Sequence, residues 1–358
     1  MNTNHKLLTA AGLLAAPALL SALPVRDRIA FAPTAGASVS MTYTMVSENS
    51  LDDMSMSMNG QEMPMEMEME MANTMEVSFT DEIEKVEGGN PTSFKRTFNT
   101  ILSEVSTEMA MDMMGQGQDE TVGGRGTSPL EGKTVAFAWK DGEYGVSWAD
   151  DEEGDASLLE DHDAHAWLAG LLPGEEVSEG GSWDIDTTAL LSIFAPCGDL
   201  HLEVEMDGGD AGMSMGPDAE LFTNLRQLMD GALEGSFTGK LAGYREVDDV
   251  RMAVIELDIE IDSVSDLADM IRESMEESLP PEMPIEMDIG AVDVNLTLEA
   301  KGELLWNASA GVPGGLSLEG EMGVSMDMSM SMDAGGQQMD MENYMEMSGS
   351  IQQTVTID

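Results

Sequence analysis

Apolar and polar residues alternate along much of this chain, and a period of two is that of a β-strand, in which every second side chain shares one face. The clearest example is residues 322–357, where methionine recurs at nearly every second position. Residues 333–336 interrupt the alternation with a glycine-containing stretch. The pattern predicts a long β-hairpin with a thioether face and a face of serine, aspartate and glutamate.

The turn decides which methionines face each other across this hairpin. We expect residues 333 and 336 to close it, and in an antiparallel pair this fixes the whole register. The predicted pairs, all on one face, are Met330 with Met339, Met328 with Met341, Val324 with Met345, and Met322 with Met347.

A second methionine hairpin is predicted nearer the N-terminus, centred on Asn59-Gly60. This dipeptide is the most favoured one for a two-residue type I′ turn. The return strand continues with methionines at every second position, including Met67 and Met69. The predicted cross-strand pairs are Met56 with Met63 and Met54 with Met65.

Helical spacing of apolar residues appears only in the middle of the chain, between capping residues, such as Asp186 before residues 187–194, and Pro or Gly breakers. A change of phase near Ile101 indicates a β-bulge within a strand. We therefore expect a β-rich α+β fold, with a large curved antiparallel sheet (a half-barrel-like meander) in a single domain over residues 38–358. The predicted helices lie near residues 158–172, 187–194, 217–233 and 264–279.

Residues 1–37 resemble an export signal in composition. Lys6 supplies a basic start, and Leu7 to Leu23 form an apolar stretch rich in alanine and leucine. That stretch is too short and interrupted for a secure membrane span, and no cysteine follows it to carry a lipid. We expect a Sec-type signal peptide, cleaved after Ala22 or after Ala37, and a secreted or periplasmic protein without a transmembrane or lipoprotein anchor.

Acidic residues dominate the charge, with 69 Asp and Glu against 15 Lys and Arg and a formal net charge of -54. Such a surface repels phosphate backbones, which argues against a nucleic-acid partner. The one cysteine, Cys197, has no second cysteine with which to form an intramolecular disulfide. The fold must therefore depend on its core rather than on covalent cross-links.

The 34 methionines are the main chemical feature of this sequence. Methionine is flexible and polarizable, so a methionine-lined sheet face suits a hydrophobic small molecule or lipid. Thioether sulfur also suits Cu(I) and Ag(I), which makes a cell-envelope metal binder the alternative. In two further interpretations methionine fills the core of a structural or interaction protein, or absorbs oxidant as sulfoxide. The residues expected to line a ligand site are Met67, Met69, Met328, Met330, Met339 and Met341.

Few other residues point to chemistry. His162 and His165 lie three apart on a predicted helix and are the candidate pair for a hard metal, although no third ligand follows from the pattern. Cys197 lies near His201 in sequence, but no protease signature surrounds it. Phosphate-binding loops and hydrolase motifs are absent from the sequence. We expect a non-catalytic protein without a cofactor.

Three short stretches of the sequence have a familiar form. They are Pro129–Val135 (PLEGKTV), Leu171–Gly174 (LLPG) with Gly180–Trp183 (GGSW), and Gly302–Trp306 (GELLW). Together they resemble a group of uncharacterised exported bacterial proteins, in which a helix ends at Leu-Pro and a Gly-x-Ser-Trp turn enters a strand. The general pattern is also similar to LolA/LppX-type envelope proteins, which implies an open antiparallel half-barrel around helices with an apolar cavity. Neither resemblance implies catalytic residues.

Overall fold

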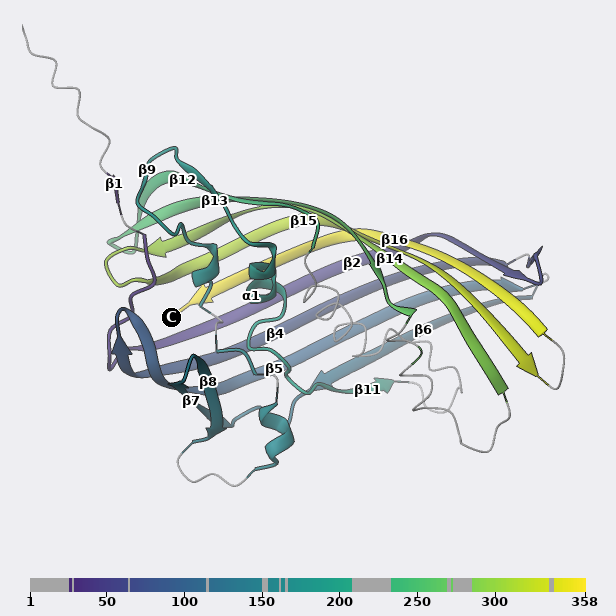
Figure 1. Cartoon of the computed structure of the whole chain (residues 1–358), viewed down its shortest axis with the longest axis horizontal. Coiled ribbons are helices and arrows are strands. Elements are labelled where there is room, and N and C mark those ends of the chain that lie inside the picture. Colours follow the sequence, from purple (N-terminus) through teal and green to yellow (C-terminus); the bar gives the residue numbers. More distant parts are fainter. Residues whose placement is uncertain are drawn as a thin grey trace, which may run out of the picture.

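Long antiparallel strands dominate the computed structural model, as the alternating pattern predicts (Figure 1). The structure describes residues 26–27, 29–63, 65–113, 116–149, 154–160, 162–164, 167–207, 233–268, 272, 285–334 and 338–358. The long strands are β2 (Ser38–Met58), β4 (Met65–Glu87), β5 (Asn90–Met113), β6 (Gln116–Thr127), β12 (Gly235–Val247), β13 (Val250–Asp266), β14 (Ile285–Asn307), β15 (Val312–Ala334) and β16 (Gln338–Ile357).

The shorter strands are β1 (Arg26–Asp27), β3 (Gln61–Glu62), β7 (Thr134–Lys140), β8 (Glu143–Trp148), β9 (Val177–Ser178), β10 (Ser182–Asp184) and β11 (Glu203–Asp207). All strands except the β1–β9 pair belong to one antiparallel sheet, whose main order is β10-β12-β13-β14-β15-β16-β2-β4-β5-β6-β11; off this path, β3 pairs with β2, β7 with β5, and β8 with β7. Strands β10 and β11 stand at the two ends of this order, and within the described residues the sheet is not closed. The expected β-rich fold with one large curved antiparallel sheet is therefore confirmed. Within the described residues, no helix is long and apolar enough to cross a membrane.

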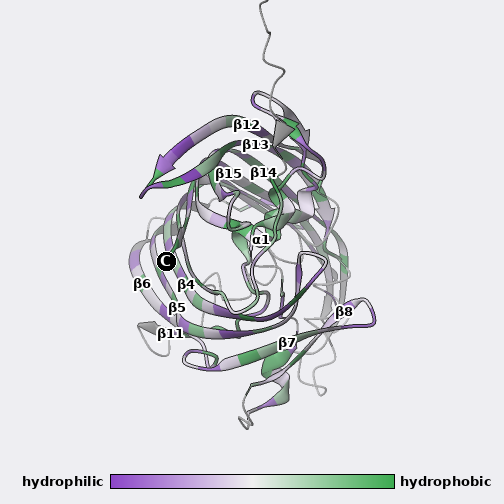
Figure 2. Ribbon diagram, turned by 90° about the vertical axis from the view of Figure 1, so that its left-hand side faces the viewer, coloured by the Kyte–Doolittle hydropathy of each residue, from purple (hydrophilic) through white to green (hydrophobic). Residues whose placement is uncertain are grey.

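The main core lies against the concave face at one end of the long strands, which we call the packed end. The short helix α1 (Leu191–Phe194) sits inside the curve of the sheet there (Figure 2). Ile193 and Phe194 of α1 are buried, and they join one continuous cluster with strand residues such as Phe79, Ile259 and Trp306. The opposite end of β2, β15 and β16 carries the methionines and extends beyond this cluster, and we call it the methionine end (Figure 1).

The segment 29–37, just before β2, is built into the packed end. Ile29 is 1% exposed, and the Phe31 ring stacks on Trp167 with 4.9 Å between ring centroids. The backbone N–H of Ala32 donates to the carbonyl oxygen of Gly311 at 2.9 Å. This segment therefore contributes side chains and backbone bonds to the fold, although the sequence places it within the expected leader.

The predicted helix over 158–172 is replaced by two 3-10 turns, Ala156–Leu159 and Ala169–Leu171. Between them the backbone pairs with another segment, because the N–H of Asp163 donates to the carbonyl oxygen of Cys197 at 2.8 Å. Leu168 adopts a left-handed conformation with φ 55°, which a continuous helix excludes. Tertiary pairing thus overrides the helical spacing of the apolar residues.

The other predicted helices have different outcomes. Residues 187–194 form a 3-10 turn (Thr187–Leu190) continuing into α1, and the Asp186 side chain caps it as expected by accepting from the N–H of Thr188. The predicted start at residue 264 is wrong, because β13 pairs with β14 up to Asp266, which then accepts from the N–H of Ala268. The described residues do not include 217–232, 269–271 or 273–279.

Candidate functional site

Methionines from both predicted hairpins meet in one patch at the methionine end. Strand β16 pairs with β15 on one side and with β2 on the other. In this register, three positions on each strand form a grid of three by three, with eight methionines around Asn343. We call this patch the methionine array, and its members are Met326, Met328 and Met330 on β15, Met345, Asn343 and Met341 on β16, and Met54, Met56 and Met58 on β2.

A β-bulge brings the β2 methionines onto the same face as the others. The pairing of β2 with β16 steps from Leu51 opposite Met347 to Asp53 opposite Glu346, so Asp52 is an extra residue. Inner positions of β2 are therefore odd-numbered up to Leu51 and even-numbered from Met54 onward. The array lies on the continuation of the concave face.

The register of the C-terminal hairpin differs from the prediction by two residues. Asp333 pairs with Gln338, so the connection spans four residues rather than the two between 333 and 336. A shift of two preserves the face of every side chain, so the predicted thioether face is correct although its pairs are wrong. The observed pairs are Met332 with Met339, Met330 with Met341, Met326 with Met345, and Val324 with Met347.

The N-terminal hairpin follows the prediction at its tip. Asn59 and Gly60 both have positive φ, 52° and 71°, as a type I′ turn requires. The N–H of Met63 donates to the carbonyl oxygen of Met56 at 2.9 Å, consistent with the predicted pair. The predicted pair of Met54 with Met65 is not found among the described residues. On that side β2 pairs with β3 only at Ser57–Glu62 and Met58–Gln61, while Met54 pairs with Met345 of β16 on the other side.

The array is half-buried, and one side of it is sealed by aliphatic residues. Its eight methionines are neither fully buried nor fully exposed. On the β14 side, Ile289 pairs with Met330 and Val292 pairs with Met328. Ile289 and Val292 are 3% and 0% exposed and belong to a small second core cluster. The methionines thus lie beside buried aliphatic side chains, but they remain partly accessible to a small solute.

Asn343 is the one polar residue of the array. Its side-chain oxygen, Oδ1, is buried and has no hydrogen-bond partner among the described residues. A buried carbonyl oxygen without a partner costs about 1–3 kcal/mol. The Asn343 amide is therefore the polar group at the centre of an otherwise thioether-lined patch.

Two of the other predicted lining residues lie apart from the array. Met67 and Met69 are half-buried on β4 and pair with β5, where Met69 faces Met109. They do not join the array through β2, because the pairing of β2 with β4 ends at Ser50 and Glu70. Met339 adjoins the array, because it lies on the same face of β16, two residues before Met341, and pairs with Met332. Of the six predicted residues, the structure therefore brings Met328, Met330 and Met341 together, with Met339 beside them.

Two cavities lined by described residues are each unsuited to a large apolar ligand. The apolar one lies under α1 with a volume of about 20 Å³, which is room for about one water molecule. It is lined by side chains such as Phe194, Leu296 and Met322. A larger hollow of about 440 Å³ lies where β2 and β4 separate, but Glu48, Glu70 and Glu108 contribute to its lining.

His162 and Cys197 lie at the packed end, where the described residues complete no metal-binding group around them. The Nδ1 atom of His162 is 3.4 Å from the carbonyl oxygen of Cys197, and burial lowers its pKa. His165 lies outside the described residues. Burial raises the pKa of the Cys197 thiol to about 12, which disfavours the thiolate. Within the described part, no group of three or more His, Cys, Asp or Glu side chains is placed to hold a metal ion.

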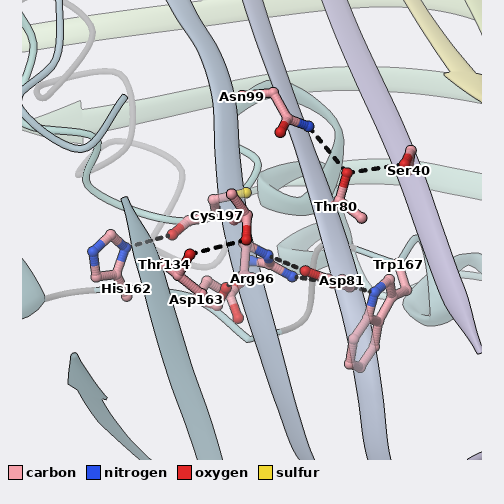
Figure 3. A network of polar contacts seen from close by, with 11 residues as sticks. Ser40, Thr80, Asp81, Arg96, Asn99, Thr134, His162, Asp163, Trp167 and Cys197 are labelled. Atoms are coloured by element: carbon pink, nitrogen blue, oxygen red, sulfur yellow. Dashed lines mark hydrogen bonds and ion pairs between the residues drawn. The ribbon is translucent and has the colours of Figure 1, made fainter. Parts of the chain in front are cut away.

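A buried ion pair near these residues was not predicted (Figure 3). Arg96 and Asp81 are both 0% exposed and form two parallel bonds of 2.8 Å, from Nε to Oδ1 and from the terminal nitrogen to Oδ2. Trp167 Nε1 donates to the same carboxylate at 2.6 Å. Burial opposes the charged form of Arg96, but attraction to Asp81 outweighs it and raises the arginine pKa. Through the hydrogen bond from Trp167, the ion pair fixes the segment around Trp167 against the sheet.

The sequence contains a signal for this pair. Arg96 occupies an inner position between Phe94 and Phe98, and Asp81 lies between Phe79 and Ile83 in the same way. A charged residue on the apolar side of an alternating strand needs a partner. Asp81 and Arg96 are direct cross-strand neighbours on β4 and β5.

Comparisons with known proteins add no family. No protein-family model matches the chain, and no curated protein matches it. Among solved structures, the crystal structure of the outer membrane protein OprG from Pseudomonas aeruginosa matches at 6% identity and a TM-score of 0.20. That match covers 90% of this chain and 98% of the OprG chain. At this TM-score the likeness supports no conclusion about fold or function.

Proposed function

We propose that this protein binds a soft monovalent metal ion, Cu(I) or Ag(I), through the thioethers of the methionine array. It does so outside the cytoplasm, after removal of its leader. The observation that carries the proposal is the convergence of eight methionines from two hairpins, distant in sequence, on one patch of three neighbouring strands. Thioether sulfur is a ligand type that favours Cu(I) over hard cations.

The array methionines lie where the sheet is only partly covered. At the packed end, β4 and β15 fill many inner positions with residues such as Val77, Phe79, Leu316 and Leu318, which pack well in sheets. Methionine also fills part of this core, because Met41 and Met45 of β2 are buried there. The eight methionines of the array differ from these two in being only half-buried, which leaves them available to a ligand.

A carrier of a hydrophobic ligand, with a LolA-like cavity, is the competing proposal. A drug-sized ligand occupies a pocket of about 300–1,000 Å³, and the apolar cavity under α1 has about 20 Å³. We infer instead that the curved, half-barrel-like sheet serves as a stiff support. The neighbouring strands hold the sulfur atoms in place, and no large pocket is needed.

Charge on the opposite face of the array favours a cation. The exposed residues between the methionines include Asp53, Asp327, Glu342 and Glu346. A carboxylate roughly 10 Å from a monovalent cation contributes about 1–2 kcal/mol at an effective dielectric constant of 20. The ligands themselves are neutral, so these carboxylates balance the charge of the metal without competing as hard ligands.

Native mass spectrometry with Ag(I) tests the proposal, because Ag(I) binds thioethers without a redox step. We expect saturable uptake by the wild-type protein and loss of uptake when Met58, Met330, Met341 and Met345 are replaced by leucine. Leucine conserves volume, at a cost usually below about 1.5 kcal/mol per site. The matched control replaces Met67, Met69 and Met109, which are half-buried methionines on β4 and β5.

Each alternative gives a different result. Equal loss of Ag(I) in the array variant and in the control would show that the array is not the site. A co-purifying lipid-sized mass with no silver uptake would support the hydrophobic-ligand carrier. With neither adduct, the methionines act as packing only, and the proposal fails.

A further inference from the structure

The pairing of β15, β16 and β2 orders the array into rows that cross all three strands. Two rows consist of methionine alone, and the row between them has Asn343 on its central strand. The rows are Met330–Met341–Met58, Met328–Asn343–Met56, and Met326–Met345–Met54. Resting on the proposed function above, we infer that the array holds two soft monovalent ions, one in each all-methionine row.

Within one row, the three sulfur atoms can converge on a single ion. Adjacent strands lie about 4.8 Å apart, so the outer methionines of a row are separated by roughly two such spacings. Each side chain has three rotatable bonds and a sulfur well beyond Cβ. The outer two lean toward the central Met341 or Met345, and three thioethers then surround one ion from one side.

The two all-methionine rows are too far apart to share one ion. Met341 and Met345 are four residues apart on β16, which is about 13 Å at 3.3 Å per residue. At that separation two monovalent cations repel each other by about 1.3 kcal/mol at an effective dielectric constant of 20. The attraction between the two ions and the carboxylates on the opposite face is larger than this repulsion, so both rows can hold an ion at the same time.

Asn343 separates the rows and reduces the central row to two thioethers. Its unpartnered Oδ1 atom lies between the two proposed ions, two residues from Met341 and two from Met345. A cation on either side attracts the negative end of this carbonyl dipole. This accounts for a buried polar atom that no described residue satisfies.

Counting bound Ag(I) ions in single-substitution variants tests the two rows. We expect two ions on the wild-type protein, one on Met341→Leu, one on Met345→Leu and none on the double variant. Met67→Leu, outside the array, should keep two. Asn343→Met completes the central row, and we expect a third ion or a redistribution of the two. Far-ultraviolet circular dichroism shows whether each variant keeps its sheet.

The outcomes separate this inference from the proposed function. A saturable number other than two, or loss of both ions in Met341→Leu, would overturn the two-row arrangement while leaving soft-metal binding in place. Absence of any uptake would overturn both. X-ray absorption at the silver edge provides a second readout, since three sulfur neighbours per ion are expected and a nitrogen or oxygen shell would contradict the assignment.

Discussion

The buried pair of Arg96 and Asp81 allows a stability prediction from geometry. In Asp81→Asn the amide oxygen can still accept one hydrogen bond, but Arg96 loses its counter-charge in a site with 0% exposure. Removing one partner of a buried ion pair costs about 3–5 kcal/mol. Since domains have about 5–15 kcal/mol of stability in total, we expect Asp81→Asn to lose a large part of its unfolding free energy.

The reverse substitution leaves the opposite charge without its partner. In Arg96→Met the buried Asp81 carboxylate loses the guanidinium that donates two hydrogen bonds to it, while Trp167 still donates to it. Removing this partner also costs about 3–5 kcal/mol, so we expect the two single variants to lose similar amounts of unfolding free energy.

Urea unfolding followed by tryptophan fluorescence measures these differences, because Trp167 donates to the same carboxylate. The double variant Asp81→Leu with Arg96→Met removes both charges, and we expect it to recover most of the loss, since apolar replacement of a buried pair is often neutral. A loss below about 1 kcal/mol in Asp81→Asn, or a double variant as unstable as the sum of the single variants, would refute the reasoning.

Three further predictions concern the packed end and the strand contacts. A chain truncated through residue 37 loses the buried Ile29, worth about 1.5–3 kcal/mol, and the partly buried Phe31 ring that stacks on Trp167. It should therefore melt earlier than a chain beginning at residue 23, and intact-mass analysis of exported protein should show cleavage before residue 26. Burial raises the pKa of Cys197 to about 12 from 9.0, so the thiol loses its proton at a lower pH in the unfolded chain than in the folded one. The unfolding free energy therefore falls as pH rises from 9 to 12, and calorimetry should show a weaker fall in Cys197→Ala. An added Cβ at Gly349 meets the carbonyl oxygen of Glu48 and lies 2.5 Å from Oδ1 of Asn49. Gly349→Ala should therefore lower the free energy of urea unfolding by about 1–3 kcal/mol. The control Gly174→Ala should be close to neutral, because there is open space around Gly174.

Features set by local chemistry follow from the sequence. The Asn59-Gly60 turn, the Asp186 cap and the alternating faces depend on neighbours a few residues away, and each appears as predicted. The phase change near Ile101 is a bulge at Asn99, where Thr100 pairs with Ser78 and Phe98 with Phe79.

The array itself depends on a long-range pairing that alternation does not encode. The sequence predicts two methionine-faced hairpins, but only the contact of β16 with β2 joins them into one patch. The register error has a similar cause, since a glycine pair inside a longer connection looks the same in sequence as a two-residue turn. The failure near 158–172 reflects backbone pairing with residues 197–198, about 35 positions away.

Extra residues interrupt several strands, among them Asp52 in β2, Asn99 in β5 and Gly290 in β14. Because side chains alternate with a period of two, each insertion turns everything beyond it to the other side. Deleting Asp52 alone would point Met54, Met56 and Met58 outward and bring Ser55 and Ser57 inward. Insertions or deletions in these strands must therefore come in steps of two residues if the methionine end is to keep facing the same side. Whether the number of residues in a strand is odd or even is thus as strict a constraint on this fold as the identity of any one side chain.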